Sequence, residues 1–393
     1  MEEWKKVKLG EVCDLIAGFA FKANDFGNYS SKVIKIGDIN PPYVNFATMI
    51  GVDMSNYDRE KLQRYEVCYD DFVLAMTGAT IGKVGRYIEN TPAYLNQRVL
   101  LFRPFATHNK YIYHVVCSES FHKYVINHID SESAQPNISA ATIGKYEFYL
   151  PPLSIQERIA NILSSLDDKL ECNRRINDNL EQQAQALFKS WFVDFEPWGG
   201  KMPDDWKEGT LLDIADYLNG LAMQKYPSKE GFVSLPVLKI KELGQGYCDD
   251  ASDRCTSTIS SQYIVNDGDV IFSWSGTLLV DIWCGGVCGL NQHLYKVTSK
   301  SYPKWFYLYW TISHLEEFRR IASDKAVTMG HIKRGDLEKA KVLIPPITTI
   351  ATLSNQITPM IENIINVRKE NTKLAQLRDT LLPRLMSGEL KIS

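Results

Sequence analysis

The chain of 393 residues contains one succession of short motifs twice, and this duplication restricts its fold more than any other feature. The stretch WKKVKLGEVCDLIAGFAFK from Trp4 returns as WKEGTLLDIADYLNGLAMQK from Trp206. VIKIGDI, DDFVLAMTGAT, LNQR and YLPPL then follow in the first copy, and VLKIKEL, GDVIFSWSGT, LNQH and LIPPI follow in the same order in the second. Loops change length between copies while the elements persist, which explains the varying spacing. The duplication predicts two homologous globular α/β domains.

A long heptad pattern follows the Pro-Pro pair that ends each copy. From Ser154 to about Trp191 a continuous helix would measure roughly 55 Å at ~1.5 Å per residue, which suits a spacer rather than a core helix. Each helix has one apolar seam, so we expect the two to form an antiparallel coiled coil with pseudo-two-fold symmetry. The predicted seam residues are Leu163, Leu166, Leu170, Asn177, Leu180, Leu187, Ile357, Met360, Ile364, Asn371, Leu374 and Leu381.

Polar and proline residues interrupt this apolar seam. Asn177 and Asn371 take the same heptad position, and buried seam asparagines favour one register at a cost in stability. The alternative is that both face solvent on locally unwound helices. Pro359 should bend or break the second helix, because proline lacks an amide donor and clashes with the preceding turn. Arg174 and Arg175 should lie outside the seam, toward solvent or a partner.

The patterns predict an α+β protein of five segments. Residues 1–150 and 206–344 are the globular domains, 151–196 and 345–393 are the spacer helices, and 197–205 is the linker PWGGKMPDD. A pseudo-two-fold arrangement would return the second helix to the start of the first domain. The end of the chain is therefore expected near Trp4.

The composition limits the kind of partner. The 44 basic and 47 acidic side chains leave a formal charge of −3, which argues against a protein that coats nucleic acid by bulk electrostatics. Any DNA binding is then local, or shared with a partner. The eight cysteines are scattered, and the sequence contains no apolar run of roughly 18 residues and no signal-type N-terminus. A reducing, cytoplasmic location without disulfides fits best.

One tetrapeptide, Asn40-Pro41-Pro42-Tyr43, matches the catalytic motif of methyltransferases that act on the adenine amino group. In the duplicated alignment it lies opposite Gly244-Gln245-Gly246-Tyr247. Both are turn-forming sequences after an apolar strand, so one shared turn explains both. A glycine-rich strand-turn-helix unit for a methyl donor is missing from the sequence, which disfavours the catalytic interpretation.

Two other motifs fail on spacing. TGATIGKVG from Thr77 has three residues between Gly78 and Gly82 where a phosphate-binding loop needs four, and Val84 follows Lys83 where that loop needs Ser or Thr. Cys284 and Cys288 lack matching cysteines in the first copy and the spacing of a zinc ribbon or finger. No metal site is expected.

The sequence resembles the specificity subunits of type I restriction-modification systems over almost its whole length. The resemblance rests on the Trp-x-x-x-x-Leu-x-(Glu/Asp) openings, the Thr77-Gly78 and Ser275-Gly276 turns after each aspartate-led strand, and the two Leu-Asn-Gln motifs. It rests above all on PPLSIQERIANILSSLDDKLECNRRI from Pro151 with the following FKSWFVDFEPW. Each strand motif is weak, but their doubled order is specific.

The resemblance implies a DNA-recognition subunit without catalysis of its own. Each globular domain would be a target recognition domain that reads one half of a split, asymmetric DNA sequence. The paired helices would set the spacing and dock two modification subunits, which bind S-adenosylmethionine and methylate adenine. Restriction subunits would add ATP- and magnesium-dependent cleavage, so the chain itself would hold no cofactor.

Residues after the shared turns are the candidates for contact with DNA, because Arg and Lys suit guanine or phosphate, Gln suits adenine, and short hydroxyls suit phosphate. They are Thr80, Lys83, Arg86, Gln97, Arg98, Ser275, Thr277, Gln292, His293 and Lys325. For each the alternative is a solvated or fold-supporting role, and Asn96 with Gln97 could satisfy buried backbone groups. Loops that differ between the copies, Asp53 to Arg64 and Asp249 to Ser261, are expected to encode specificity.

Two other functions compete with the adaptor. A stand-alone adenine methyltransferase would bind S-adenosylmethionine by itself. A coiled-coil protein that organises DNA would bind scrambled duplexes equally well.

Overall fold

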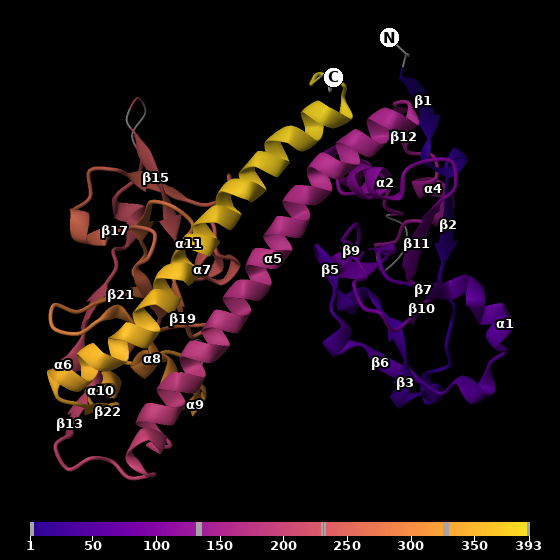
Figure 1. Cartoon of the computed structure of the whole chain (residues 1–393). Helices are drawn as coiled ribbons and strands as arrows, with labels where there is room; N and C mark the ends of the chain where they lie inside the picture. Colours follow the sequence, from indigo (N-terminus) through magenta and orange to yellow (C-terminus); the bar gives the residue numbers. More distant parts are fainter. Residues whose placement is uncertain (1–3, 131–135, 229–230, 232, 325–329, 391–393) are drawn as a thin grey trace. The chain divides into compact units, whose positions relative to one another are not determined.

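The protein is described by a computed structural model that places residues 4–130, 136–228, 231, 233–324 and 330–390. Contacts along the chain divide it into two compact units (Figure 1). The first unit is Met1–Asp168 with Leu377–Ser393, and the second is Lys169–Gln376. Each unit thus holds one globular domain with a part of both long helices. The five-segment division drawn from the sequence stays a prediction.

The first unit contains three sheets. In bonding order they are β2 (Cys13–Ala17), β11 (Val99–Pro104), β8 (Phe72–Ala75), β9 (Val84–Arg86), β5 (Tyr43–Val44) and β4 (Ile39–Asn40); β6 (Ile50–Val52), β3 (Phe26–Ile34), β10 (Ala93–Leu95) and β7 (Glu66–Val67); and the pair β1 (Lys5–Lys8) and β12 (Glu147–Leu150). Strand β8 reads FVLA and is buried throughout, as a continuous apolar run between two neighbours should be.

The second unit repeats this topology. Its sheets are β14 (Asp216–Asn219), β21 (Leu294–Thr298), β18 (Val270–Ser273) and β19 (Leu279–Ile282); β16 (Arg254–Thr256), β15 (Ser234–Leu238), β20 (Cys288–Leu290) and β17 (Ile264–Val265); and the pair β13 (Lys207–Thr210) and β22 (Lys341–Ile344). In both units the second sheet contains one parallel pair, β3 with β10 and β15 with β20. The predicted pair of homologous α/β domains is confirmed.

Short helices accompany the sheets in both units. The first unit has α1 (Arg59–Leu62), α2 (Asn109–Val116), α3 (Glu119–Asn127) and α4 (Ala140–Ile143), and the second has α6 (Leu211–Ile214), α7 (Ile240–Gln245), α8 (Lys304–Ser313), α9 (Leu315–Asp324) and α10 (Arg334–Leu337). Helix α8 reads KWFYLYWTIS and buries most of its length, which anchors the largest apolar cluster of the second unit.

One glycine in each copy explains why the opening motif is shared. A Cβ on Gly18 would lie 2.2 Å from the carbonyl oxygen of Asn96, and a Cβ on Gly220 would lie 2.2 Å from that of Asn291. No side chain fits at such a distance. The same close approach between the end of β2 or β14 and the Leu-Asn-Gln turn therefore recurs in both units.

The two turns that were aligned across the copies differ in structure. Asn40 and Tyr43 pair across the β4–β5 hairpin, whereas Gly246, with φ at 83°, ends helix α7 in the left-handed region. The expectation of one shared turn is wrong. The physical reason is that Pro41-Pro42 offers no amide donors for a helix, while the second copy has helix-compatible residues there.

The two heptad segments form α5 (Leu153–Phe192) and α11 (Ile347–Met386), each of 40 residues. Their antiparallel course is visible inside the second unit, where Asn173 contacts Asn371 and Glu181 contacts Arg368. Of the two expected effects of Pro359, a break is wrong, since α11 continues through it, and a bend stays a prediction. Proline costs roughly 3 kcal/mol inside a helix, and the buried neighbours Ile357 and Ile361 offset it by packing in the core.

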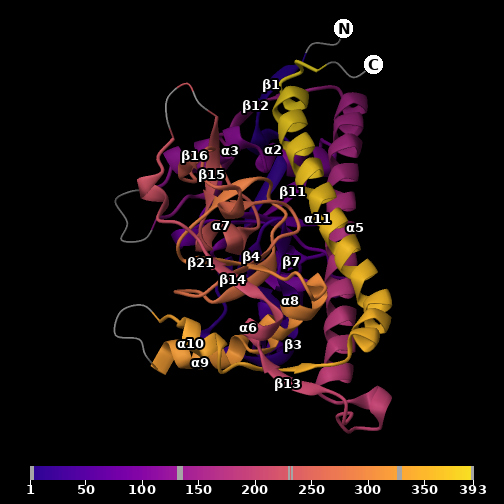
Figure 2. The same cartoon turned by 90° about the vertical axis from the view of Figure 1, so that its left-hand side faces the viewer.

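Within the first unit, α11 returns to the start of the chain (Figure 2). A Cβ on Gly388 would lie 3.3 Å from the Trp4 ring, and Trp4 and Leu390 pack against the same apolar cluster. The expected closeness to Trp4 is confirmed for the described end of the chain. Of the helices that the structure describes, none combines the length and apolarity that spanning a membrane requires.

Candidate nucleic-acid interface

In the first unit, the chain leaves the central strand β8 at a glycine turn that a distant segment holds in place. The amide of Gly78 donates to Pro136 O and the amide of Ile138 donates to Met76 O, both at 3.0 Å. Gly78 has φ at 74°, a conformation that favours glycine. Residues about 60 positions apart in the chain thereby meet at the end of the strand.

The second unit repeats this arrangement at the end of β18. The amide of Gly276 donates to Gly330 O and that of Ile332 donates to Trp274 O, both at 3.0 Å. Gly276 also has a positive φ, at 63°. The two copies therefore present the same backbone here with different side chains, a common way to vary recognition on one scaffold.

A surface hollow of about 480 Å³ lies at this place in the first unit. Its polar lining comes from Thr77, Gln97, Arg98, Asn137 and Ser139, beside Ala17 at the end of β2. Thr77 is 9% exposed, and its hydroxyl has no hydrogen-bond partner among the described residues. Two predicted DNA-contacting residues, Gln97 and Arg98, are exposed here.

The equivalent place in the second unit holds an aromatic cluster. The Trp274 ring centroid lies 5.9 Å from that of His293 and 6.2 Å from that of His331. The Trp274 indole N–H donates to Asn219 Oδ1 at 3.0 Å, and Ser275 Oγ lies 3.0 Å from His293 Nδ1. Two predicted residues, Ser275 and His293, thus share one hydrogen bond, and Ser275 is 6% exposed.

The other predicted contacts lie around these turns. Lys83 is exposed, while the Thr80 hydroxyl is buried without a hydrogen-bond partner in the described part of the chain. In the second unit Thr277 is exposed and Gln292 Nε2 lies 3.3 Å from His293 Nε2. Lys325 falls outside the described residues.

Arg86 lies differently from the expectation. It is 9% exposed, its Nε is 3.2 Å from Asp70 Oδ1, and its Nη2 is 3.4 Å from Asp168 Oδ1. An arginine on the last residue of β9, paired with carboxylates on a loop and on α5, joins the sheet to the helix. Its burial and these two carboxylates favour fold support, the alternative given for each candidate, over the predicted contact with DNA.

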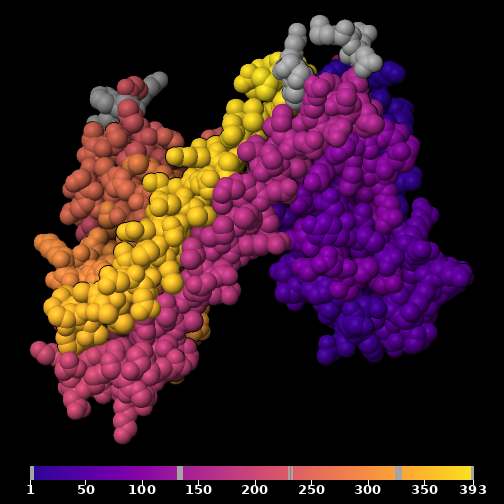
Figure 3. All heavy atoms as spheres, viewed as in Figure 1, coloured from indigo at the N-terminus to yellow at the C-terminus, as the bar shows by residue number. Residues whose placement is uncertain are grey.

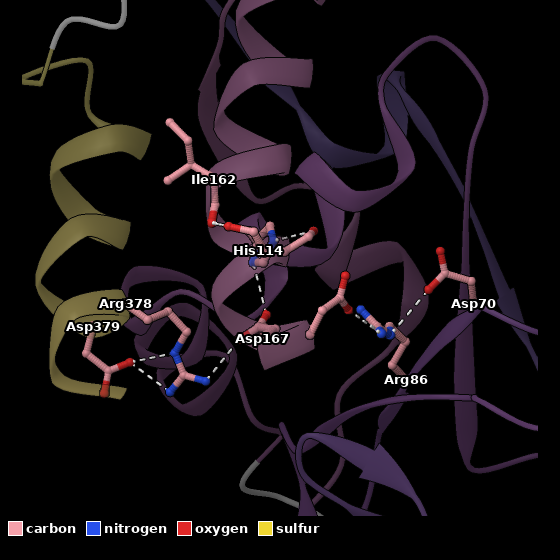
Figure 4. A network of polar contacts seen from close by, with 10 residues as sticks. Asp70, Arg86, His114, Ile162, Asp167, Arg378 and Asp379 are labelled. Carbon is pink, nitrogen blue, oxygen red and sulfur yellow. Dashed lines mark hydrogen bonds and ion pairs between the residues drawn. The ribbon is translucent and has the colours of Figure 1, made fainter. Parts of the chain in front are cut away.

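A polar network continues from Arg86 along the first unit's helices (Figure 4). Buried His114 on α2 lies 3.3 Å from Ser164 Oγ and 3.9 Å from Asp167 Oδ2. Arg378 on α11 donates to Asp167 Oδ1 at 3.2 Å and pairs with Asp379 at 2.8 Å. Burial raises the pKa of the Asp167 carboxyl, and Arg378 opposes that shift. Domain and helices of this unit are thus joined by charge as well as by apolar contact.

None of the predicted seam residues is exposed. Four of them are buried, namely Leu163, Asn177, Ile357 and Ile364. The others are half-buried: Leu166, Leu170, Leu180, Leu187, Met360, Asn371, Leu374 and Leu381. Arg174 and Arg175 keep 53% and 64% of their side chains exposed. Figure 3 shows side chains of α5 and α11 on the viewed face that other elements leave uncovered.

At the polar centre of the seam, Asn173 of α5 pairs with Asn371 of α11. Asn173 Nδ2 donates to Asn371 Oδ1 at 2.8 Å and to Glu370 Oε2 at 2.7 Å. Asn177 is 7% exposed, and its Oδ1 has no partner among the described residues. Asn177 and Asn371 take the same heptad position in their two helices. In an antiparallel pair, equivalent heptad positions need not lie opposite each other, and here Asn371 lies opposite Asn173.

The second unit joins its domain to the helices through a different arginine. Arg368 on α11 donates to Asp281 Oδ1 at 2.7 Å, to Ile282 O at 2.9 Å and to Glu181 Oε1 at 2.7 Å. Both carboxylates hold the pKa of Arg368 above its ordinary value despite burial. A guanidinium thus joins sheet and helix in each unit, although it is on the sheet in one and on the helix in the other.

Sequence reasoning missed several residues of this interface. Trp274 stands directly before the shared Ser-Gly turn, which was a usable signal. Asn137 and His331 precede the two Pro-Pro pairs by the same distance, but neither belongs to a shared motif. They form equivalent bridges, with Thr77 and Ser275 respectively, and only the fold reveals them.

Comparisons with known proteins agree with this duplicated architecture. The family model described as type I restriction modification DNA specificity domain matches residues 1–182 and 203–378. A type I restriction enzyme specificity subunit, MjaIX, from Methanocaldococcus jannaschii is 28% identical over 72% of this chain and 69% of its own length. The HindI specificity subunit from Haemophilus influenzae is 20% identical over 99% of this chain and 100% of its own.

A solved structure shares the fold. The crystal structure of a type I restriction-modification S subunit from M. genitalium covers 99% of this chain and 97% of that chain, with a TM-score of 0.59 and 13% identity.

Proposed function

This chain belongs to the family of type I restriction-modification DNA specificity domains, and from that premise we propose that it reads a split, asymmetric DNA sequence with one half-site for each unit. Its role is DNA recognition, and neither a stand-alone methyltransferase nor a non-specific DNA organiser is favoured. The observation that carries the proposal is the repeated turn at the ends of β8 and β18. It keeps its backbone bonds and changes its side chains.

Two unlike readers in one chain predict two unlike half-sites. Symmetry-related readers dock about one helical turn apart or at multiples of it, with unread base pairs between. A hollow lined by Arg98 and Asn137 and a cluster built from Trp274 and His293 offer different donors and shapes. The target is therefore asymmetric.

The partners in this proposal are double-stranded DNA, two modification subunits and restriction subunits. The near-neutral chain, with a formal charge of −3, would share phosphate neutralisation with those partners. The uncovered side of α5 and α11 would receive the modification subunits, and the complex would act in the cytoplasm.

The chain in this proposal catalyses no reaction itself. S-adenosylmethionine would bind to the modification subunits, and ATP and magnesium would bind to the restriction subunits. Asn40 and Tyr43, the ends of the tetrapeptide that matches a methyltransferase motif, pair across a hairpin next to the Arg86 strand. Their placement suits a turn that supports the sheet.

The decisive experiment maps N6-methyladenine across the genome of the source strain with and without this gene. Loss of methylation at one split, asymmetric motif is the expected result and identifies both half-sites. Where the gene is silent, the full chain reconstituted with purified modification subunits and a duplex library gives the same readout. Methylation of all library members alike would overturn the proposal in favour of non-specific binding, and S-adenosylmethionine binding by the chain alone would favour the methyltransferase.

A further inference from the structure

Four positions in each unit surround the end of the central strand, and they differ between the copies while the backbone is preserved. In the first unit they are Ala17, Met76, Arg98 and Asn137, and all four line the hollow of about 480 Å³. In the second unit they are Asn219, Trp274, His293 and His331, and Trp274 contacts the other three.

Backbone pairing establishes this equivalence without any comparison of side chains. The amide of Met76 donates to Arg98 O at 3.0 Å, and that of Trp274 donates to His293 O at 3.4 Å. Asn137 and His331 bridge to Thr77 and Ser275. The four positions, hereafter the strand-end positions, are thus the same places on one scaffold.

The residue types at these positions suit base edges. Arginine binds guanine O6 and N7 with two hydrogen bonds, and asparagine or glutamine binds adenine N6 and N7 in the same way. The first unit places Arg98, Asn137 and Gln97 around one hollow, beside the buried Thr77 hydroxyl that lacks a partner among the described residues. A hollow so rich in donors matches the purine acceptors of the major groove.

The second unit has another chemistry at the same places. Trp274 replaces Met76 and His293 replaces Arg98, so a wide aromatic surface stands where the first unit has a guanidinium. The His293 ring is also oriented by Ser275. Such a surface favours apolar contact, for example with the thymine methyl, over bidentate contact with guanine.

We propose that the strand-end positions determine which bases each unit reads in duplex DNA, with Arg98 reading a guanine of the first half-site. This inference rests on the proposed function. It also moves the centre of specificity away from the divergent loops, Asp53 to Arg64 and Asp249 to Ser261, that the sequence had indicated. Arg98 and Asn137 are specificity-determining residues, and His293 and Trp274 take their places in the second unit.

The test uses the full chain assembled with its modification subunits and a randomised duplex DNA library. N6-methyladenine in the library is sequenced for the wild type and for Arg98→His, Asn137→Asp and Arg59→His. Arg98→His should reduce the preference for guanine at one position of the first half-site by roughly 5- to 150-fold, the range for one bidentate contact. The second half-site should stay unchanged.

Arg59 on α1 provides the matched control, because it is an exposed arginine of the same unit within a divergent loop. A motif that shifts with Arg59→His and not with Arg98→His would overturn the inference and place specificity in the loop. The reciprocal change His293→Arg should add a guanine preference to the second half-site. No change there would count against the equivalence of the two units.

Failure of the underlying function would look different. If the wild-type complex methylated the library without a split motif, the proposed function itself would fall before any variant was compared. If the Arg98→His complex has a lower melting temperature or assembles incompletely, its motif cannot be compared with that of the wild type, and the Asn137→Asp variant tests the inference instead. It should change the first half-site alone, and an unchanged motif with that variant contradicts the inference.

Discussion

Two arginines of the first unit lie in different surroundings. Arg98 is exposed beside the hollow, whereas Arg86 is 9% exposed and paired with Asp70 and Asp168. Both lie close to motifs that the two copies share, so the sequence analysis named both as candidates for contact with DNA. Burial separates them, because a buried guanidinium needs carboxylates of its own chain and a recognition arginine needs access to DNA.

This separation predicts opposite effects for two nearby residues. Arg86→Ala should lower the free energy of unfolding by about 1–3 kcal/mol, since Asp70 loses its cation. Lys83→Ala should leave that free energy unchanged and weaken first-half-site binding, with a shallower dependence of affinity on salt. Denaturant unfolding and binding titrations over a salt series measure both. Unchanged affinity of the Lys83 variant at every salt concentration would remove it from the interface.

His114 is the second residue whose environment makes a testable difference. Burial, helped by the nearby charges of Arg86 and Arg378, lowers the pKa of His114 to about 3 from the ordinary 6.5. Asp167 lies 3.9 Å away and is engaged by Arg378, so it does not reverse the shift. The folded protein keeps this imidazole neutral at pH values where the unfolded chain binds a proton.

The sign of the pH effect follows. Below pH 6.5 the unfolded state binds one more proton at this site than the folded state, so stability falls as the pH decreases toward about 3. We expect the melting temperature of the wild type to drop more between pH 7.5 and about 5 than that of His114→Gln. Parallel curves for both proteins would show that the buried histidine does not govern this loss.

Among the elements, the helices α5 and α11 are paired through polar residues of their seam. Asn173 and Asn371 form a hydrogen bond across the seam, and Glu370 accepts a second bond from the same Asn173 amide. The buried Oδ1 atoms of Asn173 and of Asn177, one turn further, both lack a partner among the described residues. Asn173 and Asn177 thus share an unsatisfied oxygen, and the amide of Asn173 also donates across the seam.

The same substitution at both positions distinguishes these roles. Asn177→Leu should raise the free energy of unfolding by about 1–2 kcal/mol, since it removes an unsatisfied buried group and adds apolar area. Asn173→Leu should lower it by about 1–3 kcal/mol, because Asn371 then loses its donor. Urea denaturation of the full chain is the measurement. A shift in the same direction for both variants would argue against the observed register.

For the whole molecule, duplication within one chain has the largest consequence. A dimer of identical subunits presents identical readers, whereas fused copies are free to diverge. They have diverged at the strand-end positions, and also at β4 and β5, which extend the first unit's sheet by a hairpin. The backbone bonds are retained, so at these positions the copies differ in side chains more than in the scaffold.

Restoring the symmetry should restore a symmetric target. In a chain where residues 206–344 are replaced by a second copy of residues 4–150, both units carry the same strand-end positions. The methylated motif of its reconstituted complex should consist of two identical half-sites in inverted orientation. The wild-type complex in the same library is the control. An asymmetric motif from the symmetrised chain would mean that specificity is set outside the exchanged domains.

The sequence alone determined the elements of this protein. Motif order revealed two homologous domains, and the heptad spacing predicted both long helices. These features depend on local conformation and on periodicity, and a chain displays both directly. The family resemblance used the same information.

Tertiary structure decided which side chains meet. Asn137 reaches Thr77, and Asn173 rather than Asn177 reaches Asn371, because strand bridging and helix register bring distant parts of the chain together. Packing also carried α11 through Pro359 and buried Arg86. Such outcomes depend on the sum of many contacts across a core, and no pattern within a short segment encodes that sum.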